Sequence, residues 1–374
     1  MRRSNPRTGR ACPSAEQGVR FPRVTRTAPN RPAGQASEPH VVRVDRDLFL
    51  PAARRLVTQE GGDVEAAARR LVDSAPRHGI DLTRCFVVLE PGTGPGKGAV
   101  VRQACLAVPG SGRTAMFFLS EPAGPRPEDA RDHRERTACV EAACAHLRDA
   151  LATRVRLAQA LPEPEHDWAT LALRDAGFID VGTLAYMRAE PTDTHPREER
   201  AAWPAGVRVE RFSDLGASGT SVERRRADAL LAQALEASYV DTLDCPELCG
   251  LREMDDVLDS HRSTGRYDPA LWHVVWHDDR PAGALLLSRC PDLSCVELVY
   301  LGLAPSLRGQ GLGRRLLAYA MARARRAHPS WAISCAVDER NAPALRLYES
   351  LGFERGARRC ALVRPIGSSP RTNT

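Results

Sequence analysis

The chain is distinctive first for what it lacks. Lys97 is the only lysine in the sequence, so all but one of the 53 basic residues are arginines. No stretch approaches the roughly 18 consecutive apolar residues that a membrane-spanning helix needs. The opening residues Met1–Ser4 are basic, but no apolar segment of a signal peptide follows them. We therefore expect a protein that is neither exported nor inserted into a membrane, with a cytoplasmic location.

Cysteine occurs eleven times, yet no two cysteines are spaced as Cys-x-x-Cys. Cys245 and Cys249 could be combined with His261 into a metal site, but no second pair of ligands at zinc spacing accompanies them. Several cysteines lie inside apolar strand or helix patterns. We therefore expect reduced, mostly buried thiols and no metal.

Composition indicates a globular protein with a charged N-terminal tail. Apolar residues make up 43% of the chain and charged residues 27%, and the length allows two domains. Residues 1–40 hold eight arginines and two glutamates (8 − 2 = +6), which equals the net charge of the whole chain. This tail has few large apolar residues, so we expect disorder. A nucleic-acid-binding arm is conceivable, but we favour a solvated extension.

Apolar periodicity predicts strands and helices in both halves of the chain. In the first half the expected helices are 48–57, 64–73, 128–153 and 167–176, and the expected strands are 85–89, 99–108, 114–119 and 155–161. The segment Pro91–Gly98 mimics a nucleotide-binding P-loop, but it joins two strands and lacks the terminal Ser or Thr. We predict a hairpin loop there.

The two halves are related by a repeat. Aligning residue 156 with residue 331 superimposes 156–161 on 331–336 and, at the same offset, Ala176-Gly177-Phe178 on Leu351-Gly352-Phe353, without a gap. We therefore predict tandem domains of one fold. The expected division is a disordered tail 1–40, a first domain 41–190, a linker 191–205, a second domain 206–366 and a disordered tail 367–374.

A glycine-rich hexapeptide stands in the second half. Arg308-Gly-Gln-Gly-Leu-Gly313 follows an apolar strand (296–303) and precedes an amphipathic helix (314–327). Glycines allow successive backbone N–H groups to turn toward one point, and the helix start adds further unpaired N–H groups. Such a site suits phosphate or pyrophosphate. Neither the dinucleotide fingerprint nor the P-loop motif matches these residues.

The hexapeptide resembles the acyl-CoA-binding motif Arg/Gln-x-x-Gly-x-Gly/Ala of the GNAT acetyltransferase superfamily. Further along the chain, Asn341 to Phe353 resembles the family's Asn-x-x-Ala-x-x-Leu-Tyr-x-x-x-Gly-Phe helix and turn. The resemblance implies an α/β fold of two tandem GNAT-like domains, each a mixed, mostly antiparallel sheet flanked by helices. It also implies acetyl-CoA as co-substrate, without a metal.

The same resemblance assigns the cofactor site to the second domain. The glycine loop would anchor the pyrophosphate, the end of the preceding strand would bind the pantetheine arm and polarise the thioester carbonyl, and a bulge would splay that strand, with Gly302 suited to the distortion. The expected cofactor-binding residues are Leu301, Gly302, Leu303, Arg308, Gly309, Gln310, Gly311, Leu312, Gly313, Arg314 and Asn341.

Two residues are candidates for proton transfer. Tyr348 lies one heptad after Asn341, on the same helix face, and could protonate the departing thiolate, although an aromatic residue there could also be core. Glu297 could deprotonate the amine or form a structural salt bridge. Some relatives place the base at the position of Ala336 instead. Attack by an amine already deprotonated through water remains a further option.

Tyr239, Asp241 and Asp244 are candidates for binding the substrate, because acidic residues gather there and could receive a cationic amine; a solvated loop is the alternative. We expect an N-acetyltransferase that acts by direct attack of a primary amine, on a small metabolite as mycothiol synthases do or on a peptide N-terminus. A CoA-binding sensor without turnover is the alternative.

The first domain is expected to be degenerate. Leu173 stands at the repeat position of Tyr348, and His166 stands opposite Asn341. Where a glycine loop would follow the strand, Glu121–Glu128 carries three prolines and two glutamates, which remove N–H donors and repel phosphate. We therefore expect acetyl-CoA to bind only the second domain.

Overall fold

The computed structural model describes residues 38–57, 62–90, 98–123, 129–191 and 203–367. Most of the basic tail, the loop that mimics a P-loop and most of the linker therefore lie outside the described residues. The chain forms two compact units. We call Val181–Arg359 the C-terminal unit. The N-terminal unit comprises the described residues up to Asp180 together with those from Cys360 onward.

Helices and strands follow the same order in both halves of the chain. The first half holds β1 (Val41–Arg43), α1 (Phe49–Leu56), α2 (Val64–Ser74), β2 (Cys85–Leu89), β3 (Val101–Gly110), β4 (Thr114–Leu119), α3 (Ala130–Ala150), β5 (Leu157–Ala160), α4 (Asp167–Asp175) and β6 (Ile179–Ala189). The second half holds β7 (Val207–Arg211), α5 (Ser221–Tyr239), α6 (Met254–Ser263), β8 (Trp272–His277), β9 (Arg280–Cys290), β10 (Cys295–Leu303), α7 (Leu312–Ala327), β11 (Ala332–Asp338), α8 (Ala342–Glu349) and β12 (Glu354–Pro365).

The structure confirms the predicted repeat. The last three elements of the second repeat all start at the same offset from their counterparts in the first repeat. The offset is 332 − 157 for β11 and β5, 342 − 167 for α8 and α4, and 354 − 179 for β12 and β6. The fold is mixed α/β, and most of its strands pair in antiparallel fashion. The expected helices and strands of the first half are all present, with ends displaced by a few residues.

The last strand of each repeat pairs with the other repeat. In the C-terminal unit the strand order is β6-β11-β10-β9-β8-β7, and β6 runs antiparallel to β11. In the N-terminal unit the order is β1-β2-β3-β4-β5-β12, and Leu362–Pro365 of β12 pair with β5. The compact units therefore differ from the expected ranges 41–190 and 206–366: the C-terminal unit includes β6 from Val181 onward, and the N-terminal unit includes β12 from Cys360 onward.

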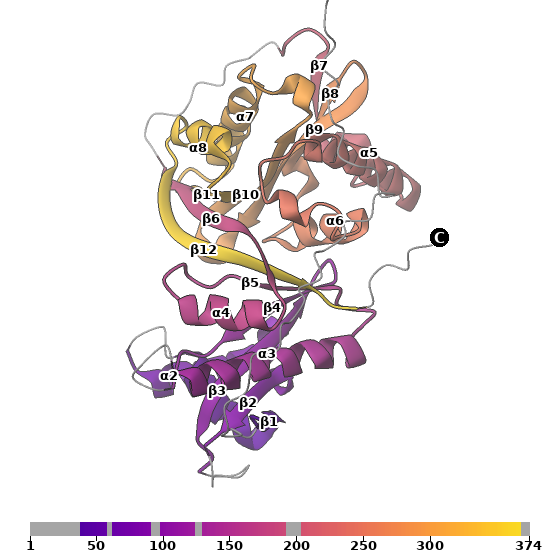
Figure 1. The fold of residues 1–374 in the computed structure, drawn as a ribbon. Coiled ribbons are helices and arrows are strands. Elements are labelled where there is room, and N and C mark those ends of the chain that lie inside the picture. Colours follow the sequence, from indigo (N-terminus) through magenta and orange to yellow (C-terminus); the bar gives the residue numbers. More distant parts are fainter. Residues whose placement is uncertain (1–37, 58–61, 91–97, 124–128, 192–202, 368–374) are drawn as a thin grey trace, which may run out of the picture. The chain divides into compact units, whose positions relative to one another are not determined.

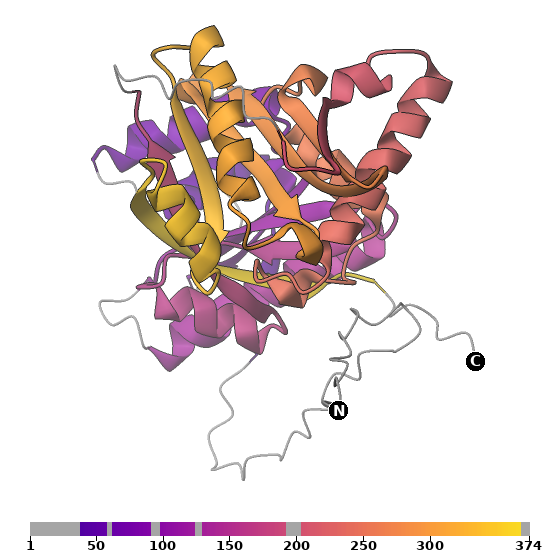
Figure 2. The same ribbon diagram turned by 90° about the horizontal axis from the view of Figure 1, so that it is seen from above.

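The sheet of the C-terminal unit has a helix layer on each face. One core contains Leu298, Ile333 and Met187 with the apolar faces of α7 and α8. The other contains Trp272, Val274 and Leu286 with α5 and α6. Figure 1 shows α7 and α8 on one side of these strands and α5 and α6 on the other, and the view from above agrees (Figure 2).

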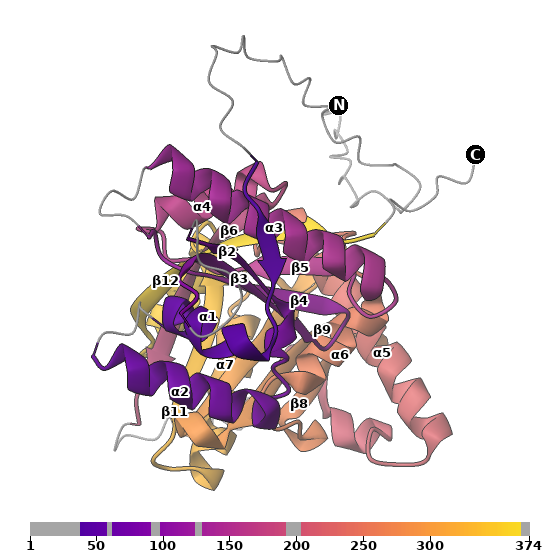
Figure 3. The same ribbon diagram turned by 90° about the horizontal axis from the view of Figure 1, so that it is seen from below.

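The N-terminal unit repeats this sandwich. Helix α3 covers the face that carries Phe86 and Ala107, while α1 covers the face that carries Val87 and Leu106. Figure 3 shows α3 and the pair α1 and α2 on opposite sides of β2, β3 and β4. Among the described residues, no helix is both long enough and apolar enough to span a membrane.

Candidate functional site

Strand β10 separates from β11 halfway along its length. The two strands pair in parallel from Cys295 to Leu298 only, and the register of β10 with β9 shifts between Leu298 and Tyr300. A bulge of this kind bends the strand and frees backbone groups. The predicted bulge is thus present, although it lies before Gly302. That glycine is needed because a Cβ there would collide with the ring of Tyr300.

The glycine loop follows directly after the separated end of β10. Gly309 and Gly311 have φ values of 75° and 73°, and a Cβ at either position would meet nothing within 4 Å. Their requirement for glycine is therefore conformational. Gly313 instead lies in the first turn of α7, where an added Cβ would come within 3.1 Å of Leu347. Its small size permits close packing between α7 and α8.

The loop presents unpaired backbone donors. Gly311 is the N-cap of α7 and offers no side chain to cap the helix. Within the described residues, the N–H groups of Gly309, Gln310 and Gly311 donate to no backbone carbonyl. The first-turn N–H groups of Leu312, Gly313 and Arg314 also lack an intrahelical acceptor. Together with the positive end of the helix dipole, these donors form an anion-binding site that fits a pyrophosphate.

The side chains of the two arginines in this segment point to protein groups. The Arg308 guanidinium donates to the carbonyl oxygens of Leu303, Ser238, Val240 and Asp241, at distances of 2.7–2.9 Å. Arg308 therefore fixes the glycine loop to the end of α5. Arg314 donates to the Ser350 hydroxyl at 3.2 Å. Charge on a phosphate would be met by the backbone rather than by these two side chains.

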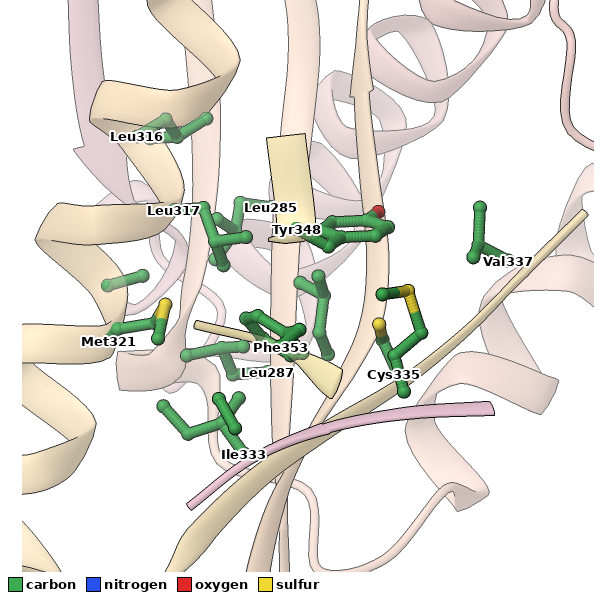
Figure 4. Close-up of a cluster of buried hydrophobic side chains, with 14 of the residues drawn as sticks. Leu285, Leu287, Leu316, Leu317, Met321, Ile333, Cys335, Val337, Tyr348 and Phe353 are labelled. Atoms are coloured by element: carbon green, nitrogen blue, oxygen red, sulfur yellow. The ribbon is translucent and has the colours of Figure 1, made fainter. Parts of the chain in front are cut away.

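Tyr348 belongs to the core that joins α7, α8 and the sheet. Its side chain is 7% exposed and packs in the cluster that contains Leu285, Phe353 and Cys335 (Figure 4). Burial raises the pKa of Tyr348 well above its ordinary value, so the phenol stays protonated. Among the described residues its hydroxyl has no hydrogen-bond partner. Both the packing role and the proton-donor role therefore suit this residue.

Glu297 lies on the face of β10 that points away from α7, α8 and Tyr348. Its side chain is half-buried, and the Cys290 thiol lies 3.7 Å from Oε2. Burial raises the pKa of the Glu297 carboxyl, and the thiol lowers it in part. No ion pair of Glu297 is present in the described parts of the chain, which argues against the structural salt bridge. A carboxylate whose pKa is raised toward neutrality is better suited to accept a proton.

The loop after α5 is held by carboxylates, of which Asp338 is buried. Asp244 accepts from the backbone N–H of Asp338 at 2.9 Å, and Asp338 is fully buried and accepts from the N–H of Cys245. Arg340 pairs with both Asp338 and Glu247 at 2.6 Å. Loss of hydration around its carboxyl raises the pKa of Asp244. Asp244 thus attaches the loop to the end of β11, although the residue, like Asp241, is partly open to solvent.

Two other predicted residues have structural partners. The ring of Tyr239 packs edge-on against Tyr300, and burial raises the pKa of Tyr239 to about 12. The Asn341 side chain caps α8 by accepting from the N–H of Ala344 at 3.2 Å, and it acts to lower the pKa of Asp244. These contacts place Asn341 near the loop, with its side-chain oxygen already used in capping.

Sequence reasoning missed three side chains that shape this region. Tyr300 lies at the bulge and its hydroxyl is 2.7 Å from that of Ser238. The buried Asp338 and the half-exposed Arg340 form the centre of the ion-pair network. The available signal was an acidic residue followed closely by an arginine at the end of an apolar strand. The partners of Asp338 and Arg340 lie far earlier in the chain and were not visible from the sequence.

The equivalent helix start in the N-terminal unit is filled by carboxylates. Asp129 caps α3 through the N–H of Arg131, and the buried Asp132 accepts from the N–H of Ala123 and from Arg102. These groups satisfy and neutralise donors that would otherwise attract phosphate. No cluster of His, Cys, Asp and Glu side chains suited to a metal ion occurs among the residues that the structure describes.

A known protein family matches the chain in this same region. Residues 235–353 match the Acetyltransferase (GNAT) family. The mycothiol acetyltransferase of Thermomonospora curvata is 42% identical over 92 residues, which cover 24% of this chain and 30% of that protein. The mycothiol acetyltransferase of Geodermatophilus obscurus is 30% identical over 197 residues, which cover 50% of this chain and 57% of that protein. The matches thus span less than two thirds of these relatives.

A solved structure extends the likeness of fold to both halves. The GCN5-related N-acetyltransferase from Sphaerobacter thermophilus has a TM-score of 0.54 and 17% sequence identity, with 88% of this chain and 97% of that chain covered. At this identity the likeness concerns the fold alone. Residues 235–353 thus match the GNAT acetyltransferase family, and the fold of both halves resembles that of this solved structure.

Proposed function

We propose that the chain is an acetyl-CoA-dependent N-acetyltransferase whose active site lies in the C-terminal unit. The observation that carries the proposal is the separation of β10 from β11 directly before an uncapped, glycine-bounded helix start. Backbone N–H groups from Gly309 to Arg314 would hold the pyrophosphate, and the free edge of β10 at Leu301–Leu303 would hold the pantetheine arm. A primary amine would attack the bound acetyl group directly.

Bound acetyl-CoA would supply an activated acetyl group and a thiolate leaving group. The protein would contribute the remaining steps. A backbone N–H of Leu301–Leu303 would stabilise the charge that develops on the carbonyl oxygen. Glu297, with its raised pKa, would accept the proton of the amine, and Tyr348 would donate its proton to the sulfur. The two groups lie on opposite faces of the sheet, at the point where its strands separate.

The acceptor that we propose is a small-molecule amine. The names of the two curated relatives support this choice over a peptide N-terminus. The N-terminal unit would hold no second acetyl-CoA site, because carboxylates occupy the start of α3.

Calorimetry with acetyl-CoA tests the anchor and the number of sites. We expect one site per chain. Gly311→Asp adds a Cβ at positive φ and a negative charge beside the phosphates, and should weaken binding by at least roughly tenfold. The matched control is Gly79→Asp in the N-terminal unit, which has a φ of 68° and open space around it. Equal binding by wild type and Gly311→Asp, or two sites per chain, would contradict the proposal.

Turnover is tested with a defined panel: an amino sugar, an amine that also carries a thiol, a polyamine and a peptide with a free N-terminus. Released CoA should be measured by chromatography, because the protein's own thiols would react with thiol reagents. We expect release with at least one small amine. Tight acetyl-CoA binding without release for any amine would favour the sensor instead.

A further inference from the structure

Strand β6 brings an exposed aromatic side chain onto the sheet of the C-terminal unit. Along β6, Ala185, Met187 and Ala189 are buried in the core beneath α7 and α8. The residues between them point to the other face. On that face Tyr186 is 38% exposed, which makes it one of the few large apolar side chains with such exposure. Nothing in the fold of β6 requires an aromatic residue there.

The pairing of strands places Tyr186 in the same surface as Glu297. Glu297 stands opposite Ser334 in the pair of β10 and β11, and Ala336 stands opposite Tyr186 in the pair of β11 and β6. Cross-strand partners share a face. The surface therefore runs from the Glu297 carboxylate across the small side chains of Ser334 and Ala336 to the Tyr186 ring.

Charge along this surface is arranged asymmetrically. Partial burial raises the pKa of Tyr186; the field of Arg359 opposes this shift, and the charge of Glu297 adds to it. Glu297 and Arg359 thus both act electrostatically on the Tyr186 phenol. At one end of the surface, a ligand with an ammonium group would meet a carboxylate that forms no ion pair within the described residues. At the other end it would meet the phenol ring of Tyr186.

We infer that Tyr186 is a specificity-determining residue, and that its ring and Ala336 form the floor on which the acceptor lies with its amine toward Glu297. The occupant is a small primary amine whose body offers a ring or other apolar face to the phenol. This surface is continuous with Glu297 and with the free edge of β10, where the acetyl group would be presented. The inference rests on the proposed function and names the acceptor side of that site.

The experiment measures KM separately for acetyl-CoA and for the best amine of the panel. Tyr186→Ala removes the ring, and should raise the KM of the amine roughly tenfold or more while leaving the KM of acetyl-CoA unchanged. Tyr186→Phe keeps the ring and should stay within about threefold of wild type. Phe118→Ala is the matched control, because Phe118 is an aromatic residue 50% exposed on a strand of the other unit.

A second pair of variants changes Ala336, the other residue on which the acceptor would lie, by adding a large or a small side chain. Ala336→Trp should abolish use of the amine and spare acetyl-CoA binding by calorimetry, whereas Ala336→Ser should behave as wild type. Thermal unfolding of each variant excludes a folding defect. If Tyr186→Ala and Ala336→Trp turn over the amine as wild type does, the inference is wrong and the proposed function stands. If no amine of the panel releases CoA from the wild type, both are overturned.

Discussion

At the scale of single residues, the ring and the hydroxyl of Tyr348 can be separated experimentally. The ring fills the core with Phe353, at a centroid distance of 5.6 Å, while the hydroxyl has no partner among the described residues. Tyr348→Phe keeps the packing and removes only the proton. We expect kcat to fall by roughly 10–10⁴-fold, with little change in the KM of acetyl-CoA or in Tm.

The core-packing interpretation of Tyr348 makes the opposite forecast. In that case Tyr348→Phe keeps near-full activity, and only Tyr348→Ala lowers activity, because the cavity that it leaves destabilises the fold. Steady-state kinetics and thermal unfolding of both variants distinguish the two interpretations. A kcat of Tyr348→Phe within about twofold of wild type would remove this residue from the catalytic machinery.

The pH dependence of activity provides a test of Glu297. Burial raises the pKa of this carboxyl, and the Cys290 thiol opposes the rise by hydrogen bonding. A base must be deprotonated to act. The acid limb, where kcat/KM falls as the pH is lowered, should therefore have its midpoint at a pH above the ordinary pKa of glutamate. Cys290→Ala removes the donor, and should therefore move that limb to still higher pH. A limb that stays fixed would show that Glu297 is not the base.

The control for this pH experiment is Cys360→Ala, which removes a half-buried thiol from the N-terminal unit. Glu297→Gln provides the second comparison. It removes the titrating group, and should abolish the acid limb together with most of the activity. If Glu297→Gln keeps wild-type activity, an amine already deprotonated in water is the attacking species.

At the scale of elements, the glycine loop depends on the end of α5. Arg308 makes four hydrogen bonds to backbone carbonyls, two of them from residues past the end of that helix. Arg308→Met keeps much of the side-chain volume and removes all four donors. We expect acetyl-CoA affinity to fall roughly tenfold or more as the loop loses its anchor. Calorimetry measures this loss.

The same variant separates positioning from direct contact. If Arg308 only positions the loop, a lower affinity should come with a lower Tm, because buried carbonyls lose their donors. If it binds a phosphate directly, affinity should fall without loss of stability and the salt dependence of binding should weaken. Arg315→Met, in the first turns of α7, removes one positive charge from a neighbouring part of the helix and serves as the comparison.

Much of this site could be predicted from the sequence because its signals are local. Glycine spacing, the strand before it and the Asn341 to Phe353 motif all lie within the single stretch 296–353, and the structure places them around one strand separation. The direction of the Arg308 side chain was not predictable, since three of its acceptors lie at positions 238–241, far earlier in the chain. The partner of β11 was not predictable either, because β6 and β12 have equivalent positions in the repeat.

At the scale of the whole molecule, the exchange of last strands makes the C-terminal unit dependent on residues before the linker. Ala185, Met187 and Ala189 of β6 are each about 1% exposed, and lie in the core with α7 and α8. A domain cut at the boundary suggested by the repeat would lose all three and leave β11 with an open edge. We therefore expect the folding unit to have other boundaries than the repeat in the sequence.

Two fragments test this dependence. The fragment 203–359 lacks β6, whereas 181–359 keeps β6 from Val181 onward. Burying the Met187 side chain alone contributes about 1.5–3 kcal/mol, and a domain has only about 5–15 kcal/mol of stability. We expect the longer fragment to unfold cooperatively and bind acetyl-CoA, and the shorter one to show neither property. Circular dichroism melting and calorimetry measure both. If the two fragments melt alike and bind alike, β6 is dispensable and the repeat boundary is also the boundary of the folding unit.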